Sequence, residues 1–287
     1  MPDSQSSPEI ESPAAQTSGD GSPPDDEDIQ TGAEMPFLDH LEEFRWRIFK
    51  SLAGVLVGAV VCSFFADFVV DVILIGPTRP TFFMYDVLGV DAVTLTLQNR
   101  TLTGQFFAYW GTVLVVGVVS GIPVALYQFW AFIEPGLYAS EKKGLRFSSV
   151  FATFFFMLGV AFGYFILTPM AVQFFAQFQI SEQIINEFDI TKYFSMVLMW
   201  SIGAGILFEL PVVVYFLSKL GMVTPDFLRT TRPYALVVVL VIAAFLTPPD
   251  PISQIIMAVP LVLLYEGSIY ISAFVEKRRR QELGMET

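Results

Sequence analysis

The chain has 287 residues, of which 54% are hydrophobic and only 15% charged, and 29 are phenylalanine. This composition is too apolar for a soluble domain of this size. The formal net charge of −12 arises mainly at the N-terminus: residues 1–34 hold nine acids and no Lys or Arg, and the remainder holds 19 acids against 16 bases, a net of −3.

Residues 1–34 are rich in Ser, Pro and Gly and contain almost nothing apolar to bury, so we predict a disordered acidic tail. The tail resembles neither a signal peptide nor an Arg-rich transit peptide, because it lacks a basic start and an apolar core. The single cysteine, Cys62, excludes an intramolecular disulfide, and its apolar surroundings indicate a packing role.

Six segments are apolar enough to be membrane spans, for which ~20 mostly apolar residues are needed. They are Ile48–Ala66, Phe106 to about Gln128, Phe147–Leu167, Tyr193–Leu217, Pro233–Thr247 and Ile252–Val275. The fifth rises only ~22 Å against a ~30 Å hydrocarbon core, so we expect the bilayer to thin beside the last two spans. We therefore predict an all-α polytopic membrane domain over residues 35–275, followed by a basic C-terminal tail over 276–287.

The distribution of Lys and Arg predicts the orientation of these spans. Six spans place both termini on one side, and that side carries 13 basic residues against 3 on the other. The positive-inside rule then places both termini in the cytoplasm. The expected location is the cytoplasmic (inner) membrane.

Two features of the spans concern their shape and packing. Pro123, Pro211 and Pro260 each remove a backbone hydrogen bond and bend a helix, which allows a concave bundle. Three G-x-x-x-G pairs, at 54/58, 117/121 and 159/163, allow close helix contact. We interpret these pairs as internal packing sites rather than contacts between subunits.

The sequence lacks the motifs of several common enzymatic and metal-binding sites. There is no G-x-x-x-x-G-K-[ST] for ATP, no H-E-x-x-H and no Cys/His cluster, and His40 is the only histidine. We expect no cofactor, no metal and no nucleic-acid partner, and the chain is not expected to be an enzyme.

Two acidic clusters flank the first two spans on the predicted cytoplasmic side. Glu42 and Glu43 lie in D-H-L-E-E-F-R-W-R, where Asp39 and Glu42 have the spacing of a capping box. Glu141 follows Ser140, a good N-cap for the third span. Favourable charge at a helix N-terminus explains both clusters equally well at this point, although the bases and aromatic residues around them suggest binding.

Glu209 is a lone acid in a run that is otherwise apolar from Phe194 to Leu217. It lies ~6 Å from the middle of its span on the cytoplasmic side, where a charge costs roughly 2.5–3.5 kcal/mol. It must face protein, water or a partner. The alternatives are a neutral carboxyl bonded to a neighbouring helix and a functional group.

Several motifs, taken together and in order, resemble the TatC family, the polytopic core of the twin-arginine protein translocase. They are H-L-E-E-F-R-W-R (40–47), L-Y-Q-F-W-A-F-I-E-P-G-L-Y-A-S-E-K-K (126–143), F-G-Y-F-I-L-T-P (162–169), F-E-L-P (208–211), R-P-Y (232–234) and L-T-P-P-D-P-I-S-Q (246–254). The resemblance covers about residues 35–274. Phe44 replaces the family's usual Leu, and T-G-Q-F (103–106) departs from its pattern before the second span.

The resemblance implies a receptor for signal peptides of folded cargo proteins that carry two adjacent arginines. It implies export driven by the proton gradient, with TatA- or TatB-like single-span partners, and self-association in a larger complex within the lipid bilayer. The residues that it assigns to the twin-arginine site are Glu43, Glu141, Arg45, Arg47, Phe132 and Glu134. It makes Glu209 a polar foothold on the concave face, Thr247 and Gln254 a docking patch for a partner helix, and Asp250 a structural acid of the turn.

A secondary transporter with Glu209 as a proton relay is the competing function. Such transporters commonly contain internal repeats, and we see none between residues 35–145 and 146–275. That comparison favours the translocase.

Overall fold

The computed structural model describes the backbone of residues 27–133, 142–181, 183–247 and 251–282, and the side chains of 41–132, 148–181, 183–247 and 251–281. The chain forms two units, Met1–Glu43 and Phe44–Thr287. The described part of the first unit is the N-terminal portion of α1 (Glu27–Phe64), so residues 27–34 are helical. The predicted disordered tail otherwise lies outside the described residues, and the division at residues 34 and 275 stays a prediction.

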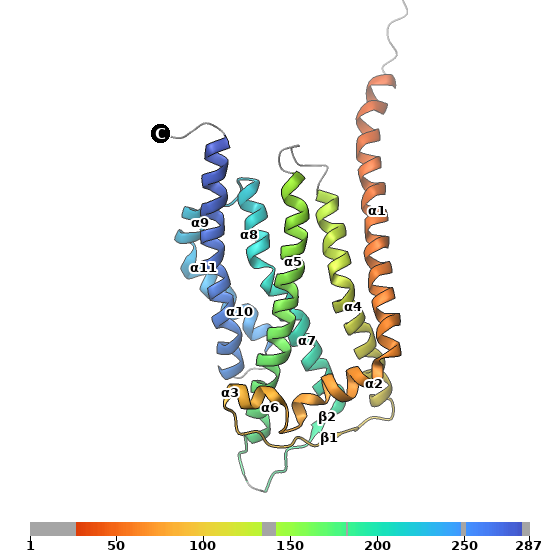
Figure 1. Cartoon of the computed structure of the whole chain (residues 1–287), viewed down its shortest axis with the longest axis vertical. Helices are drawn as coiled ribbons and strands as arrows, with labels where there is room; N and C mark the ends of the chain where they lie inside the picture. Colours follow the sequence, from red (N-terminus) through yellow and green to blue (C-terminus); the bar gives the residue numbers. More distant parts are fainter. Residues whose placement is uncertain (1–26, 134–141, 182, 248–250, 283–287) are drawn as a thin grey trace, which may run out of the picture. The chain divides into compact units, whose positions relative to one another are not determined.

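The second unit is a bundle of long helices, some of which are broken into consecutive segments (Figure 1). After α1 come α4 (Gly104–Ile133), α5 (Lys142–Phe162), α6 (Thr168–Gln177), α7 (Ile190–Phe208), α8 (Leu210–Lys219), α9 (Pro225–Thr230), α10 (Arg232–Leu246) and α11 (Pro251–Glu282). A π-helical segment, Gly163–Leu167, joins α5 to α6. The fold is therefore almost entirely helical, as predicted.

Within the described residues, five helical stretches are long and apolar enough to cross a membrane. They are Leu41–Phe64, Gly104–Phe132, Ser148–Gln177, Ile190–Lys219 and Pro251–Gln281. Each of these stretches overlaps one of the six predicted spans over most of its length. The remaining one, predicted over Pro233–Thr247, is the 15-residue helix α10, which is shorter than a bilayer-spanning helix, so a count of six crossings stays a prediction.

The third span extends further than its predicted end at Leu167, because the helix continues through α6 to Gln177. Polar side chains of α6 hydrogen-bond to a neighbouring segment of the chain, residues 91–93. The side chain of Gln173 donates to the carbonyl of Val93 at 3.1 Å and accepts from its N–H at 2.9 Å. Gln177 donates to the carbonyl of Asp91 at 2.7 Å.

The glycine pairs pack helices against each other inside the chain, as predicted. A Cβ on Gly117 would lie 2.5 Å from that of Ala59, and one on Gly121 would lie 2.6 Å from the Cα of Val55, so α1 and α4 touch closely. A Cβ on Gly163 would lie 2.6 Å from the carbonyl oxygen of Trp200 in α7. Helices without a side chain at the crossing point can approach to backbone contact.

The segment Ala66–Gln98, which we call the cap, folds across one end of the bundle (Figure 1). It contains α2 (Ala66–Phe68), a π-helical segment (Val69–Leu74), a 3-10 turn (Gly76–Thr78), α3 (Phe83–Leu88) and strand β1 (Leu97–Gln98). Strand β1 pairs in parallel with β2 (Phe188–Asp189), with Leu97 opposite Phe188. The sequence predicts no membrane span over residues 67–98.

Two tyrosines of the spans fix the cap to the bundle. The hydroxyl of Tyr164 donates to the carbonyl of Ile73 at 2.6 Å, and that of Tyr193 donates to the carbonyl of Leu74 at 2.8 Å. These carbonyls end the π-helical segment of the cap and have no partner in the next turn. The tyrosines therefore satisfy a helix end that is otherwise expensive to bury.

Candidate functional site

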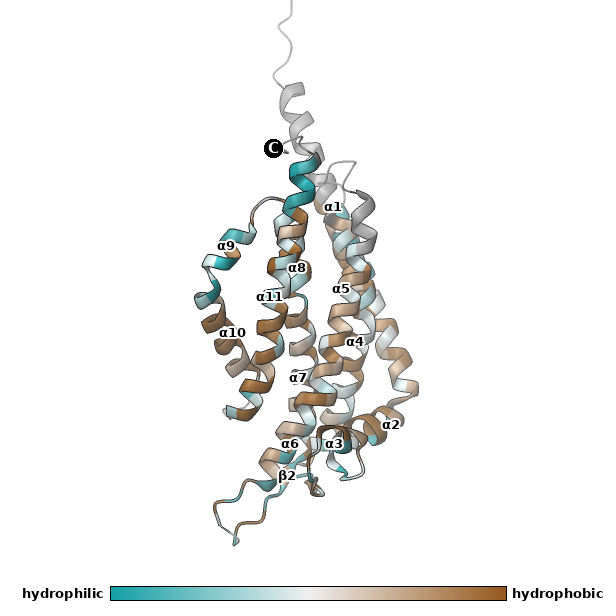
Figure 2. Ribbon diagram, turned by 60° about the vertical axis from the view of Figure 1, so that its left-hand side comes forward, coloured by the Kyte–Doolittle hydropathy of each residue, from teal (hydrophilic) through white to brown (hydrophobic). Residues whose placement is uncertain are grey.

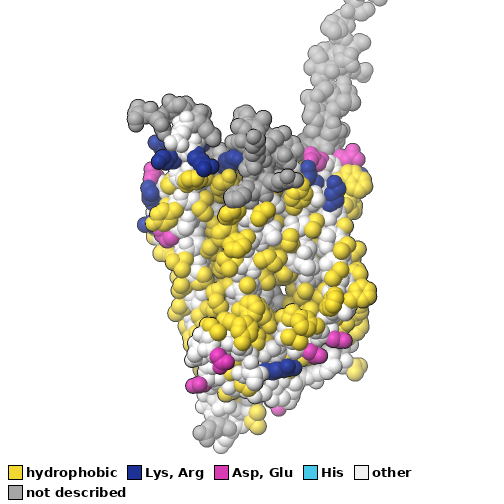
Figure 3. Space-filling view, in the orientation of Figure 1, with side chains coloured by type: hydrophobic (Ala, Val, Ile, Leu, Met, Phe, Trp, Pro, Cys, Tyr) yellow, Lys and Arg dark blue, Asp and Glu magenta, His cyan; other side chains and the backbone are white. Residues whose placement is uncertain are grey.

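Phe132, one of the residues predicted to bind, lies at the end of the bundle opposite the cap, which we call the basic end. Here α11 ends in a run of basic residues, and α9 carries Arg229 (Figure 2). In Figure 3 charged side chains gather at both ends of the molecule, and hydrophobic side chains cover the surface between them. This belt is the surface expected of a membrane-spanning bundle.

The two motifs expected to form the binding site meet at the basic end. Phe44, from the motif before the first span, contacts Phe132, from the motif after the second, with 5.1 Å between ring centroids. Close packing of α1 on α4 brings them together, because a Cβ on Gly54 would lie only 2.9 Å from the side chain of Val124. The structure therefore joins two sequence motifs that are about 80 residues apart.

Trp130 anchors the end of α4 that presents Phe132. Its side chain is 5% exposed and packs in a cluster with Ala152 of α5 and Val212 of α8. Its ring also meets Phe216 edge-on, with 5.4 Å between centroids. Two helices, α5 and α8, thus hold the last turn of α4 in place.

Of the acids predicted for this site, the structure describes Glu43 alone. Glu43 lies in α1, directly before Phe44, and Arg45 and Arg47 follow in the same helix. Glu134 and Glu141 lie outside the described residues, as does Asp250 at the other predicted site. The structure therefore places Phe132 of the predicted site against Phe44 of the other motif, and the pairing of Glu43 with Glu141 stays a prediction.

Glu209 stands at a break in the fourth span. Helix α7 ends at Phe208 and α8 begins at Leu210, with Pro211 in its first turn. The backbone carbonyl of Glu209 accepts from the N–H groups of Val212 and Val213, at 2.9 and 3.0 Å. Proline cannot donate to the preceding turn, which explains why the helix restarts here. Pro211 therefore bends the span, as predicted.

The carboxyl of Glu209 is unusual in its surroundings. Its Oε1 atom is buried, and within the described residues nothing donates a hydrogen bond to it. Burying a hydrogen-bond acceptor without a donor costs free energy of folding. A carboxyl oxygen in this environment is therefore a candidate functional group.

The hairpin of α10 and α11 presents a different surface. Thr247 is only 5% exposed, and its hydroxyl donates to the carbonyl of Ala243 at 2.9 Å. Gln254 donates through Nε2 to the carbonyl of Leu240 at 3.2 Å. Both predicted docking residues therefore bind within the hairpin, while Phe245 beside them is 81% exposed.

An ion pair that the sequence analysis did not predict joins the other end of this hairpin. Arg232, the first residue of α10, donates through Nη2 to Oε2 of Glu266 in α11 at 2.6 Å. A signal was present, because a basic residue opens the short span and Glu266 interrupts the apolar run of the last one. Two side chains on neighbouring antiparallel helices are expected to face each other there.

At the cap end, Asp189 caps helix α7. Its Oδ1 accepts from the backbone N–H groups of Thr191 and Lys192, at 3.0 and 3.1 Å. The N–H of Lys192, followed by that of Thr191, holds the pKa of Asp189 below its usual range. As for other chemistry, no group of three or more His, Cys, Asp or Glu side chains that could hold a metal ion occurs in the described part of the chain.

The fold and these sites define a class of protein: a polytopic helical membrane protein with charged ends, an aromatic contact between two motifs at one end, and a partly buried acid, Glu209, at a break in one span. A family model described as Sec-independent protein translocase protein (TatC) matches residues 39–260. The chain belongs to the TatC family, and it is thus a membrane-embedded component of the twin-arginine protein translocase. The family transports proteins and is not a family of enzymes.

Relatives and solved structures agree with this assignment. TatC proteins from Blattabacterium sp. subsp. Periplaneta americana (strain BPLAN) and Halalkalibacterium halodurans are 35% and 37% identical over 260 and 262 residues. The aligned regions cover 86% and 88% of this chain, respectively, and 98% of each relative. A crystal structure of the twin-arginine translocase receptor TatC matches with a TM-score of 0.68 and 34% identity, over 83% of this chain and 99% of that one. A second, in DDM, matches with a TM-score of 0.69 and 35% identity, over 81% and 99%.

Proposed function

We propose that this chain is the receptor subunit of the translocase and binds signal peptides that carry two adjacent arginines. The observation that carries the proposal is the contact between Phe44 and Phe132, which joins the two motifs that hold the predicted acids. The chain sits in the cytoplasmic (inner) membrane with both termini in the cytoplasm. Folded cargo reaches it from that side before export.

The chemistry of recognition rests on two carboxylates. A guanidinium is planar and binds a carboxylate through two parallel hydrogen bonds. Glu43 and Glu141 each take one arginine of the pair, and Glu134 and Phe132 complete the surface. Arg45 and Arg47 lie on the same helix as Glu43. They repel the arginines of a signal peptide that binds out of position, because like charges that face each other are unfavourable.

Glu209 acts on the segment of cargo or partner that enters the membrane. Its buried Oε1 has no donor within the described residues, which supports a role as a hydrogen-bonding foothold for an incoming helix. No Lys, Arg or His lies within its span, over residues 193–217. A bare charge is expensive at that depth, so the carboxyl works as a neutral hydrogen-bonding group.

The hairpin of α10 and α11 docks a single-span TatA- or TatB-like subunit, and the proton gradient drives export through the assembled complex. The exposed apolar face around Phe245 supports this part of the proposal. Gln254 uses Nε2 within the hairpin and keeps its amide oxygen for a donor on the partner helix. Thr247 holds the end of α10 from inside, and Asp250 shapes the turn.

Export by Glu209 variants tests the foothold. Glu209→Gln keeps the hydrogen bonding without the charge and should retain most export of a folded Arg-Arg reporter, whereas Glu209→Ala should abolish it at matched protein levels. A Gln variant as inactive as the Ala variant would refute the neutral role. Full activity of the Ala variant would remove Glu209 from the mechanism.

Crosslinking tests the docking patch. Cysteine at position 254 should crosslink to the membrane helix of a TatA- or TatB-like subunit, and cysteine at 158, on the exposed side of α5, should not. Crosslinks from the third span alone would contradict the docking site.

A further inference from the structure

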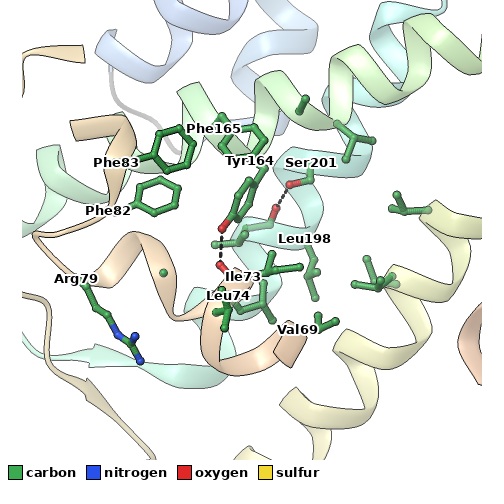
Figure 4. A pocket seen from close by; sticks show the side chains of 18 of the residues that line it. Val69, Ile73, Leu74, Arg79, Phe82, Phe83, Tyr164, Phe165, Leu198 and Ser201 are labelled. Atoms are coloured by element: carbon green, nitrogen blue, oxygen red, sulfur yellow. Dashed lines mark hydrogen bonds between the residues drawn. The ribbon is translucent and has the colours of Figure 1, made fainter. Parts of the chain in front are cut away.

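A cavity of about 680 Å³ lies between the cap and helices α4, α5 and α7. Figure 4 shows its cap-side wall, where Phe82 and Phe83 face Tyr164 and Phe165. Aliphatic side chains, such as Val116, Val160 and Leu198, line the rest. The cavity therefore lies in the half of the bundle next to the cap, beside the charged surface at that end.

The polar groups within the wall are already bonded. The hydroxyl of Tyr164 donates to the carbonyl of Ile73 at 2.6 Å, and that of Ser201 donates to the carbonyl of Val197 at 2.8 Å. An apolar cavity whose polar atoms are satisfied does not hold ordered water well. The wall thus favours an apolar occupant.

The rim carries the opposite chemistry. Arg79 and Thr81 lie at the cap edge of the cavity, and both side chains are exposed. The guanidinium of Arg79 extends away from the aromatic rings (Figure 4), and it forms no ion pair within the described residues. An exposed guanidinium and a hydroxyl beside an apolar cavity are arranged for a ligand with an apolar body and an anionic head.

We propose that the cavity binds a glycerophospholipid from the leaflet on the cap side, with an acyl chain inside and the phosphate on Arg79 and Thr81. Arginine suits phosphate because its planar fork donates two hydrogen bonds at once. Glycerophospholipids with different head groups share the phosphodiester group. We therefore expect Arg79 and Thr81 to recognise this group and not the rest of the head group.

The size of the cavity favours a chain over a helix. A helix with its side chains is about 10–12 Å across, so a volume of about 680 Å³ would hold roughly 6–9 Å of helix, little more than one turn. A volume in this range instead suits a single small ligand. A flexible acyl chain also adapts to a wall of aromatic and branched side chains.

The test is photocrosslinking of the purified full chain in detergent to phosphatidylglycerol with a diazirine in one acyl chain. The expected labels fall on peptides of α5 and α7 that line the cavity, around Met157 and Leu198. Ala161→Trp fills the cavity and should remove these labels. Leu158→Trp, on the same helix but outside the cavity and 44% exposed, is the matched control and should keep them.

A second arm tests the rim without disturbing the fold. Arg79→Gln should weaken binding of the phosphatidylglycerol probe about two- to fivefold, as for an exposed ion pair. It should leave binding of a diacylglycerol with the same diazirine chain unchanged, and Lys192→Gln, which removes another exposed cation near the cap, should change neither.

Three results would overturn the proposal. They are equal labelling of the two Trp variants, equal loss of both lipids in Arg79→Gln, and labelling of the cavity by an Arg-Arg signal peptide in place of the lipid. Because binding alone is measured, these results are independent of whether the chain exports cargo.

Discussion

A methyl group added at Gly159 should disrupt the contact between α5 and α7. A Cβ at this position would lie 2.5 Å from the carbonyl oxygen of Ala204 and 2.8 Å from the Cα of Gly205. Both are backbone atoms of α7, so no side chain can rotate away, and the two helices must separate. Gly111 in α4 is the matched control, because a Cβ there meets nothing of the described chain within 4 Å.

The expected magnitude follows from these two environments. Gly→Ala improves helix propensity by up to ~1 kcal/mol in both helices, and this gain cancels in the comparison. Overpacking costs typically ~1–3 kcal/mol, and it applies to Gly159→Ala alone. The free energy of unfolding of Gly159→Ala should therefore be about 1–3 kcal/mol below that of Gly111→Ala.

Unfolding of the detergent-solubilised protein in sodium dodecyl sulfate, followed by tryptophan fluorescence, measures this difference. Trp200 lies in the same interface and is only 1% exposed, so its emission reports the separation of the helices. Free energies that agree within ~0.5 kcal/mol would refute the close backbone contact.

Three further results are expected from side-chain contacts. Glu266→Gln should lower the free energy of unfolding by no more than ~1 kcal/mol, because its ion pair with Arg232 is partly exposed, and a larger loss in the same unfolding assay would contradict this. Tyr164→Phe should cost ~0.5–1.5 kcal/mol and speed hydrogen exchange in the cap, whereas Tyr270→Phe, at a 75% exposed position, should do neither. The pKa of Asp189 is lowered in the folded state, so its stabilising contribution is full at neutral pH and is lost below about pH 4; Asp189→Asn should melt with less dependence on pH between 3 and 6.

The spans could be predicted from sequence because lipid imposes a simple rule on them. Every backbone group within the bilayer must be satisfied inside its own helix, so long apolar runs become helices whatever their neighbours are. The predicted range Tyr193–Leu217 falls within the observed stretch Ile190–Lys219. The same locality explains the success at Pro211, since proline breaks the helix by a contact within its own turn.

The cap could not be predicted, because its structure depends on distant partners. Tyr164 and Ile73 are 91 residues apart, and Gln173 and Val93 are 80 apart. A single sequence without known neighbours does not show which hydroxyl will satisfy which carbonyl. The cavity behind the cap was missed for the same reason, although Arg79 lies close to Phe82 and Phe83 in the sequence.

The residues assigned to the candidate binding site stay a prediction. The motif positions indicated that Phe132 and the helix of Glu43 belong to one surface, and the contact of Phe132 with Phe44 confirms that the two motifs meet. Thr247 and Gln254 hydrogen-bond within the hairpin, and their role in docking a partner helix stays a prediction. Their assignment came from a motif, and a motif does not specify which side of a helix is covered.

Binding of a signal peptide tests the central claim most directly. The measurement is crosslinking of a peptide with adjacent arginines to the membrane-embedded chain, against the same peptide with two lysines. We expect strong crosslinking to the Arg-Arg peptide and weak crosslinking to the Lys-Lys peptide, because ammonium groups lack the planar fork of a guanidinium. In the Glu43→Ala, Glu141→Ala double variant, the two peptides should crosslink equally. Equal crosslinking of both peptides, or an unchanged preference in the double variant, would contradict the account.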